Sequence, residues 1–247
     1  MSLLKALLIK YYKINKIMDL KNKVIVITGG TKGLGKALAL SFKKEDVNVV
    51  VCARNEEELK IFQKEGILGI KADVTKENDL NNLLKIVIKK FGQLDFWINN
   101  AGIWLPHLPI EEVDWKRAHD LIEVNLFGTV YGSRVALIQM RKQNFGSIIN
   151  IISTSALEGR SGGSAYCASK YAVRGFTESL KKEVEGTNIK VISIYPGGMQ
   201  TNFFDEKKPE GYNEYMNPDF VADIIIENLK SDNPEIDLVI KRPVKQS

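Results

Sequence analysis

The sequence predicts an α/β fold in which a doubly wound, parallel sheet of seven strands forms a single domain. From residue 23 onward, short apolar runs rich in β-branched residues alternate with longer stretches of helical periodicity. This alternation is typical of a parallel sheet whose strands are joined by right-handed helical crossovers. A chain of 247 residues is also long enough to bury one substantial core, so one domain is expected.

The strands are expected to be buried on both faces, because most of the apolar runs are continuous rather than alternating. In chain order the predicted strands are Val24–Thr28, Val47–Ala53, Ile67–Ala72, Leu94–Asn99, Ser147–Ile152, Lys190–Tyr195 and Ile236–Ile240. The predicted helices are Leu34–Glu45, Glu56–Glu65, Glu77–Phe91, Trp115–Lys142, Ala165–Glu185 and Pro218–Leu229. The one long connection is Gly197–Asn217. A loop of this length in a compact domain is usually functional and often serves as a lid over the site.

Composition and charge argue against several classes of protein. The chain is 44% hydrophobic and 26% charged, which is ordinary for a soluble globular protein. No run of Lys and Arg indicates nucleic-acid binding. There are two histidines and two cysteines, and no Cys-x-x-Cys pair. A metal site is therefore not expected, and the cysteines are interpreted as buried, reduced thiols of a cytoplasmic protein.

The first 18 residues are interpreted as an amphipathic extension that precedes a domain of residues 19–247. The net charge of +5 is concentrated here, because four of the 35 basic residues precede residue 18, which leaves 31 basic against 30 acidic residues. These lysines interrupt every apolar run, so neither a secretory signal nor a membrane span is expected. Three interpretations stay open: docking on another subunit, a start at Met18, or, less favoured, attachment to an anionic membrane surface.

A glycine-rich loop follows the first predicted strand and opens the first helix. Its sequence is Thr28-Gly29-Gly30-Thr31-Lys32-Gly33-Leu34-Gly35. Glycines permit a tight turn and a close approach of the backbone to a pyrophosphate, and the helix N-terminus offers free N–H groups. In this position, directly after the first strand of a βαβ unit, the loop predicts a dinucleotide site.

The end of the second strand indicates which dinucleotide is bound. An acid at this position binds the ribose 2′-hydroxyl of NAD, but here the strand ends in Ala53 and Arg54 follows. An arginine suits the 2′-phosphate of NADP through charge-assisted hydrogen bonds. Lys32 adds a second positive charge on the same side, and no acid is expected to repel the phosphate. The sequence therefore favours NADP(H) as the cofactor.

Tyr166 and Lys170 are a candidate pair for proton transfer. They are four residues apart in a predicted helix and therefore share one face. A nearby ammonium favours the phenolate and lowers the pKa of a tyrosine from its usual value of about 10. Ser153 lies thirteen residues before Tyr166, at the end of the fifth predicted strand.

Together these motifs resemble those of the classical short-chain dehydrogenase/reductase family, which has a Rossmann-type fold, and the resemblance extends from residue 20 to residue 240. Further motifs of the family appear as Ala72-Asp73-Val74, Asn99-Asn100-Ala101-Gly102, Val124-Asn125-Leu126 and Pro196-Gly197-Gly198-Met199-Gln200-Thr201. The family usually has two adjacent serines where this chain has Ile152-Ser153; Ser155 is a less favoured rival for Ser153. The resemblance implies that NADP(H) is bound by Gly29, Thr31, Lys32, Gly33, Leu34, Gly35, Arg54, Asp73, Val74, Asn99, Ala101, Gly102, Tyr166, Lys170, Pro196, Gly197, Met199 and Thr201.

The resemblance also implies a catalytic role for four residues. Tyr166 protonates the oxygen of a carbonyl that receives a hydride, and Ser153 donates a hydrogen bond to the same oxygen. Lys170 lowers the pKa of Tyr166 and holds the nicotinamide ribose. Asn125 is expected to distort its helix and to hold a water that links Lys170 to solvent. The expected activity is the interconversion of CH–OH groups and carbonyls, with reduction favoured by NADP(H).

The substrate is expected to be a small molecule, such as a short ketone, an aldehyde or a compound similar to a 3-hydroxy acid. Apolar residues after the strand ends predict its pocket: Ile103, Trp104, Leu105, Leu108, Met199, Phe203 and Phe204. Arg160 is either an anchor for a carboxylate or, more commonly, a rim residue, and His107 is interpreted as a loop residue. The family pairs the helices within Trp115–Lys142 and Ala165–Glu185 between subunits, so a homodimer or homotetramer is expected.

Other functions remain as alternatives. A 3-oxoacyl-carrier-protein reductase is disfavoured, because the chain ends in Ile236–Pro243 rather than in the glycine-rich strand and tail typical of those enzymes. A regulator that senses NADP(H) without catalysis is also an alternative, but such proteins commonly lose the tyrosine or the lysine. A reductase of lipids at a membrane surface would require the N-terminal segment as its tether.

Overall fold

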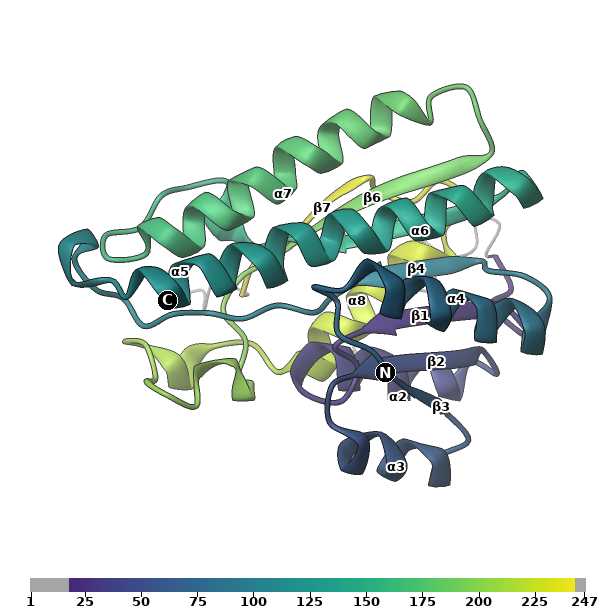
Figure 1. Ribbon diagram of the computed structural model, residues 1–247, viewed down its shortest axis with the longest axis horizontal. Helices are drawn as coiled ribbons and strands as arrows, with labels where there is room; N and C mark the ends of the chain where they lie inside the picture. The colour runs from purple at the N-terminus through teal and green to yellow at the C-terminus, as the bar shows by residue number, and fades with distance from the viewer. Residues whose placement is uncertain (1–17, 243–247) are drawn as a thin grey trace, which may run out of the picture.

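Seven parallel strands form one sheet in the order β3-β2-β1-β4-β5-β6-β7 (Figure 1). This computed structural model describes residues 18–242, so the predicted N-terminal extension lies outside the described residues apart from Met18. The strands are β1 (Val24–Thr28), β2 (Asn48–Ala53), β3 (Leu68–Lys71), β4 (Phe96–Asn99), β5 (Gly146–Ile151), β6 (Ile189–Pro196) and β7 (Asp237–Ile240). The predicted fold class, a single doubly wound parallel sheet, is confirmed.

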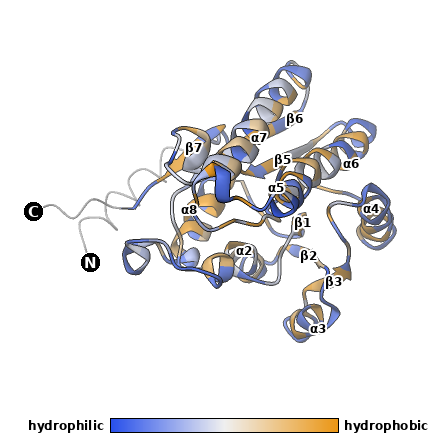
Figure 2. Cartoon of the chain, turned by 60° about the vertical axis from the view of Figure 1, so that its left-hand side comes forward, coloured by the Kyte–Doolittle hydropathy of each residue, from blue (hydrophilic) through white to orange (hydrophobic). Residues whose placement is uncertain are grey.

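Helices cover both faces of the sheet (Figure 2). One face carries α2 (Gly33–Lys44), α3 (Glu56–Lys64) and α8 (Pro218–Lys230), and the other carries α4 (Glu77–Phe91), α6 (Gly128–Gln143) and α7 (Ser164–Glu183). Successive residues of a strand point to opposite faces, so Ile25 and Ile27 pack against the first set while Val24 and Val26 pack against the second. This two-sided burial explains why the strands are continuous apolar runs.

The predicted helix Trp115–Lys142 is interrupted in the structure, which corrects the sequence prediction at this point. It consists of α5 (Trp115–Ile122), a π-helical turn over Glu123–Phe127 and then α6. The local distortion expected around Asn125 is thus present. Trp115–Gln143 as a whole has the length and apolarity of a membrane span, but α6 packs on the sheet, as the core helix of a globular domain does.

Polar side chains inside the domain join two strands to two helices. Trp97 Nε1 donates to Asn99 Oδ1 at 2.8 Å, and Asn99 Nδ2 donates to Ser133 Oγ at 2.9 Å and to Asn150 Oδ1 at 2.8 Å. Asn150 Nδ2 in turn donates to Thr177 Oγ1 at 2.9 Å. Buried polar groups are unfavourable unless they are hydrogen-bonded, and this network satisfies them while fixing β4 and β5 against α6 and α7.

We expect Gly132→Ala to destabilise the protein, because a Cβ at this position would lie 2.2 Å from Asn99 Oδ1 and 2.8 Å from Trp97 Nε1. The added methyl group must break the network or displace α6, and such overpacking with loss of a buried hydrogen bond lowers the free energy of unfolding by about 3 kcal/mol. Gly175→Ala on α7 is the matched control, since its Cβ would meet nothing within 4 Å. Chemical denaturation of both variants measures the difference, and equal stabilities would contradict the role of the network.

Candidate active site

A cavity of about 730 Å³ lies at the carboxyl ends of the strands. Its centre is the point where the strand order reverses, because β1 pairs with β2 on one side and with β4 on the other. Ligands of open α/β sheets bind at this kind of switch point. Of the residues predicted to bind the cofactor or to catalyse, all line the cavity except Gly35, Asn99 and Asn125.

The glycine loop forms one wall of the cavity. Gly29 has φ +62, and a Cβ there would lie 2.8 Å from the Cα of Ala101. Gly35 lies behind the loop, where a Cβ would be 2.4 Å from the carbonyl oxygen of Gly29. Backbone therefore packs on backbone at the start of α2, and the bare N-terminus of this helix faces the cavity. This cradle fits the pyrophosphate of a dinucleotide.

The loop after β4 holds the glycine loop in place through Asn100 rather than Asn99. Asn99, which was predicted to bind the cofactor, does not line the cavity, and its side chain belongs to the buried network under the sheet edge. Asn100 lines the cavity and donates from Nδ2 to the carbonyl oxygens of Thr28 at 2.9 Å and Gly29 at 3.1 Å. Successive side chains of a strand point in opposite directions, so only one of two adjacent asparagines can face the cavity. The sequence alone did not show which of the two it would be.

The end of the cavity beside β2 and α3 contains both positive charges that were predicted there. Arg54 is exposed, and its side chain has no ion pair or hydrogen bond among residues 18–242. Lys32, however, pairs with Glu58, which lies on α3 and also lines the cavity; Lys32 Nζ and Glu58 Oε1 are 2.8 Å apart. The expectation that no acid lies near the phosphate position is therefore wrong.

Asp73 and Val74, which were predicted to bind the cofactor, also line the cavity. The Asp73 carboxylate accepts from the backbone N–H of Thr75 at 3.0 Å and from its hydroxyl at 2.8 Å. The backbone N–H of Asp73 donates to Asp79 at 3.0 Å. These hydrogen bonds fix the turn after β3 and thereby the position of Asp73 at the cavity.

Ser153, Tyr166 and Lys170 meet at the opposite end of the cavity. Ser153 lies two residues after the end of β5. Its Oγ accepts from the backbone N–H of Ser155 at 3.1 Å, which leaves its own proton free to donate. Ser155 is thus a support for Ser153. Tyr166 and Lys170 stand one turn apart on α7, as predicted, with Lys170 Nζ 5.9 Å from the centre of the Tyr166 ring.

The ionisation of this pair differs from the prediction. Burial raises the pKa of Tyr166 to about 12, opposed by a hydrogen bond with Ser153 and, more weakly, by the charge of Arg160. Lys170 is not among the groups that lower it. Burial instead lowers the pKa of Lys170 itself to about 8, because a low-dielectric environment disfavours the charged amine. Tyr166 therefore keeps its proton at neutral pH.

Asn125 lies behind the catalytic groups and positions them. It is fully buried in the π-helical turn, and its side chain accepts from the backbone N–H of Ile103 at 2.8 Å and donates to the Ile103 carbonyl at 3.0 Å. Its Nδ2 also donates to Ser169 Oγ on α7 at 3.1 Å. The asparagine thereby ties the loop after β4 to the helix that carries Tyr166 and Lys170.

Aromatic side chains surround the space in front of Tyr166. Phe203 contacts Tyr166, and Phe204 contacts Trp104 and Tyr215, with ring centres 5.0 to 6.1 Å apart. Arg160 and His107 also line this end, and burial, followed by the charges of Arg160 and Lys207, lowers the pKa of His107. Leu105 and Leu108, predicted for the pocket, do not line it, whereas Tyr215 was missed.

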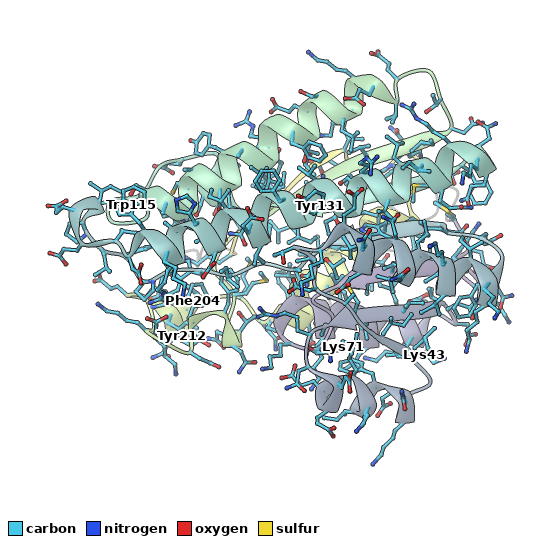
Figure 3. All side chains as sticks on the ribbon, in the orientation of Figure 1. Lys43, Lys71, Trp115, Tyr131, Phe204 and Tyr212 are labelled. Carbon is cyan, nitrogen blue, oxygen red and sulfur yellow. The ribbon has the colours of Figure 1, made fainter. Side chains whose placement is uncertain are left out.

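The predicted lid, Gly197–Asn217, covers this end and is attached to α5. Figure 3 shows Phe204 and Tyr212 of this segment next to each other, and the centres of these two rings are 5.9 Å apart. Arg117 of α5 donates twice to Glu206, at 2.9 and 2.5 Å. Short helical turns at Asn202–Phe204 and Tyr212–Glu214 give the segment its shape.

Among residues 18–242, no group of three His, Cys, Asp or Glu side chains is arranged to hold a metal ion. The site combines a dinucleotide cradle with a serine, a tyrosine and a lysine at its far end. That combination defines an oxidoreductase that uses a nicotinamide dinucleotide.

Comparison with known proteins places the chain in a family. A profile described as short chain dehydrogenase matches residues 23–211, so the chain belongs to the short-chain dehydrogenase family. It is an oxidoreductase that binds a nicotinamide cofactor and acts on CH–OH groups of small molecules.

An uncharacterized oxidoreductase of Staphylococcus saprophyticus is 34% identical over 93% of this chain and 99% of its own length. Another, from Listeria monocytogenes, is 35% identical over 84% of this chain and 90% of its own length. Among solved structures, the closed form of a serine dehydrogenase complexed with NADP+ has a TM-score of 0.83 at 26% identity, covering 91% of this chain and 96% of that one.

We expect one lysine to titrate near pH 8, well below the others, because burial lowers the pKa of Lys170 to about 8. The sign follows from desolvation: its ammonium loses the proton as the pH rises through 8, whereas exposed lysines do so near about 10.4. NMR of the protein with 13C-labelled lysine follows each side chain. The low titration should vanish in Lys170→Met; a spectrum in which every lysine titrates above pH 10 would contradict this description.

Proposed function

We propose that the chain is an NADP(H)-dependent reductase of a small carbonyl compound, with Tyr166 as the proton donor. One observation carries the proposal: Ser153, Tyr166 and Lys170 line the same cavity as the glycine loop and Arg54. In this proposal the glycine loop holds the middle of the dinucleotide. The nicotinamide end then points toward Ser153, Tyr166 and Lys170, and the adenosine end points toward Arg54. Its pyrophosphate is matched by the N-terminus of α2.

The choice of NADP(H) is supported by the end of β2. Ala53 offers no carboxylate for a ribose 2′-hydroxyl. The guanidinium of Arg54, which has no ion pair within the described part of the chain, suits a 2′-phosphate. The serine dehydrogenase to which the fold is similar was solved with NADP+. Both points favour the phosphorylated cofactor.

The proposed reaction uses the chain's own groups for the proton and for the developing charge. A bound nicotinamide supplies the hydride to the carbonyl carbon. Tyr166, protonated at pH 7 because its pKa is about 12, gives its proton to the oxygen. Ser153 donates a hydrogen bond to the same oxygen, where negative charge develops. Lys170 is placed to hold the ribose hydroxyls next to the reacting ring.

The surroundings of Tyr166 support a short substrate with an apolar portion. Trp104, Phe203, Phe204 and Tyr215 enclose it, and apolar walls with a few polar groups are usual for ligand sites. Short ketones and aldehydes fit this environment. Arg160 lines the cavity without an ion pair among residues 18–242, which keeps compounds similar to 3-hydroxy acids within the proposal.

We further propose a cytoplasmic homodimer or homotetramer. Phe127, Ile138 and Tyr171 are exposed on the π-helical turn, α6 and α7, the elements through which subunits of the family were expected to pair. Attachment to a membrane through residues 1–17 is not favoured.

Tyr166→Phe should lower the rate of NADPH oxidation by about 10²- to 10⁴-fold, the usual contribution of a general acid, while NADPH binding stays largely intact. The assay is spectrophotometric, with a panel of short ketones, aldehydes and 3-oxo acids. Tyr171→Phe is the control, because Tyr171 lies five residues further along α7, is exposed and does not line the cavity; this variant should oxidise NADPH at the rate of the unmodified protein. If Tyr166→Phe retains turnover, or if the unmodified protein reduces nothing, the proposed catalysis fails and a regulator becomes the better description.

Arg54→Asp should lower kcat/KM for NADPH by about 10²-fold, because charge-assisted hydrogen bonds are lost and a like charge faces the phosphate. NADH should be used at least as well as before. Steady-state kinetics with both cofactors measure the preference, with Lys64→Asp at the exposed end of α3 as a control for the change in charge. An unchanged preference in Arg54→Asp would remove the basis for NADP(H).

A further inference from the structure

The carboxylate of Glu58 occupies the hydrogen-bond donors beside the cofactor cradle. It accepts from Thr31 Oγ1 at 2.8 Å, from Lys32 Nζ at 2.8 Å and from Asn55 Nδ2 at 3.3 Å. All four residues line the cavity. Glu58 is the less exposed member of its ion pair, with 26% of its side chain accessible against 60% for Lys32. The contact thus belongs to the wall of the site.

These donors are the ones that a 2′-phosphate would use. Lys32 and Thr31 belong to the glycine loop, and Arg54 lies at the end of β2 next to Asn55. With Glu58 present, this corner carries two positive charges and one negative charge. A phosphate monoester carries about −1.5 to −2 at pH 7, so it competes with Glu58 for Lys32 and is repelled by it. The hydrogen bond with Lys32 also lowers the pKa of Glu58, which keeps the carboxylate ionised at neutral pH.

We propose that Glu58 is a specificity-determining residue that competes with the 2′-phosphate for Lys32 and Thr31, and so limits the preference for NADP(H) over NAD(H). The inference rests on the proposed function, because it assumes that the dinucleotide binds in this cavity with its 2′-position at Arg54. Binding of the phosphorylated cofactor requires the Glu58 carboxylate to leave the ammonium of Lys32. Binding of the unphosphorylated cofactor does not.

Other acids on α3 are held away from this corner. Glu56 pairs with Lys71 at 2.9 Å, and Glu57 pairs with Lys60 at 2.6 Å. Neither lines the cavity among the described residues. Substitution of Glu57 therefore gives the same change in net charge, one residue away on the same helix, without touching the donors.

Calorimetric titration with 2′,5′-ADP and with 5′-AMP, which differ only in the 2′-phosphate, tests the proposal without any requirement for catalysis. Glu58→Gln should bind 2′,5′-ADP about tenfold more tightly, the effect expected when a like charge a few ångströms away near the surface is removed. Binding of 5′-AMP should stay within about twofold, because this ligand has only an uncharged 2′-hydroxyl at the corner. Glu57→Gln should match the unmodified protein for both ligands. Added salt should reduce the gain in Glu58→Gln, since screening weakens the repulsion that was removed.

The outcomes separate the two proposals. If the unmodified protein prefers 2′,5′-ADP but Glu58→Gln binds it no more tightly, the role of Glu58 is wrong and the cofactor proposal stands. If 5′-AMP binding rises as much as 2′,5′-ADP binding, the effect is not specific to the 2′-phosphate and the role of Glu58 is again wrong. If Glu58→Gln gains affinity as expected but the unmodified protein shows no preference, Glu58 has the proposed role and the preference for NADP(H) is overturned. If neither ligand binds, both proposals fail.

Discussion

The site depends on the constraint that a parallel sheet buried on both faces presents the ends of all its strands at one edge. Side chains within β1 and β4 must be apolar or fully hydrogen-bonded, so free polar groups collect where the strands end. The order reverses at β1, and the connections from β1 and β4 therefore diverge and leave a crevice. The glycine loop, Asn100 and the loop of Ser153 follow the carboxyl ends of β1, β4 and β5, and for this reason they lie at the same edge of the sheet. Hydrogen bonds from Asn100 to the carbonyl groups of Thr28 and Gly29 close one side of it.

Burial has opposite effects on the pKa values of the two titratable groups at the catalytic end. It raises the pKa of the Tyr166 phenol, so the proton to be donated is present, and it lowers that of the Lys170 amine. The amine is held by the carbonyl of Ile151 at 3.2 Å. Asn125 makes this arrangement rigid, because it bonds both to Ile103 and to the helix that carries the pair. The π-helical turn is what brings the buried amide to that position, and such turns are frequently found at functional sites.

Most of the fold and the membership of the site followed from the sequence. Short apolar runs, most of them continuous and β-branched, identified every strand of the described residues, and the bounds of β1 and α4 agree with the prediction to the residue. Periodicity did not show that a helix from Trp115 would pass through a π-helical turn, since one extra residue in one turn hardly alters an apolar pattern; the family resemblance supplied that expectation. The sequence also did not show that Asn99 would be buried and Asn100 would line the cavity, because this depends on the residue at which the buried part of β4 ends. Glu58 was missed for a similar reason: three consecutive glutamates begin α3, and only the packing of that helix against the glycine loop decides which one reaches Lys32. The pKa of Tyr166 depends on burial, which the spacing to Lys170 does not report.

The proposed catalysis requires that a nicotinamide ring and a substrate carbonyl meet in front of Tyr166 within a single cavity. A crystal structure of the complex with NADPH tests this requirement most directly. The pyrophosphate should lie on the glycine loop, the 2′-phosphate beside Arg54, and the nicotinamide ring within reach of the Tyr166 hydroxyl and Lys170. A dinucleotide bound elsewhere, or a Tyr166 hydroxyl turned away from the ring, would contradict it.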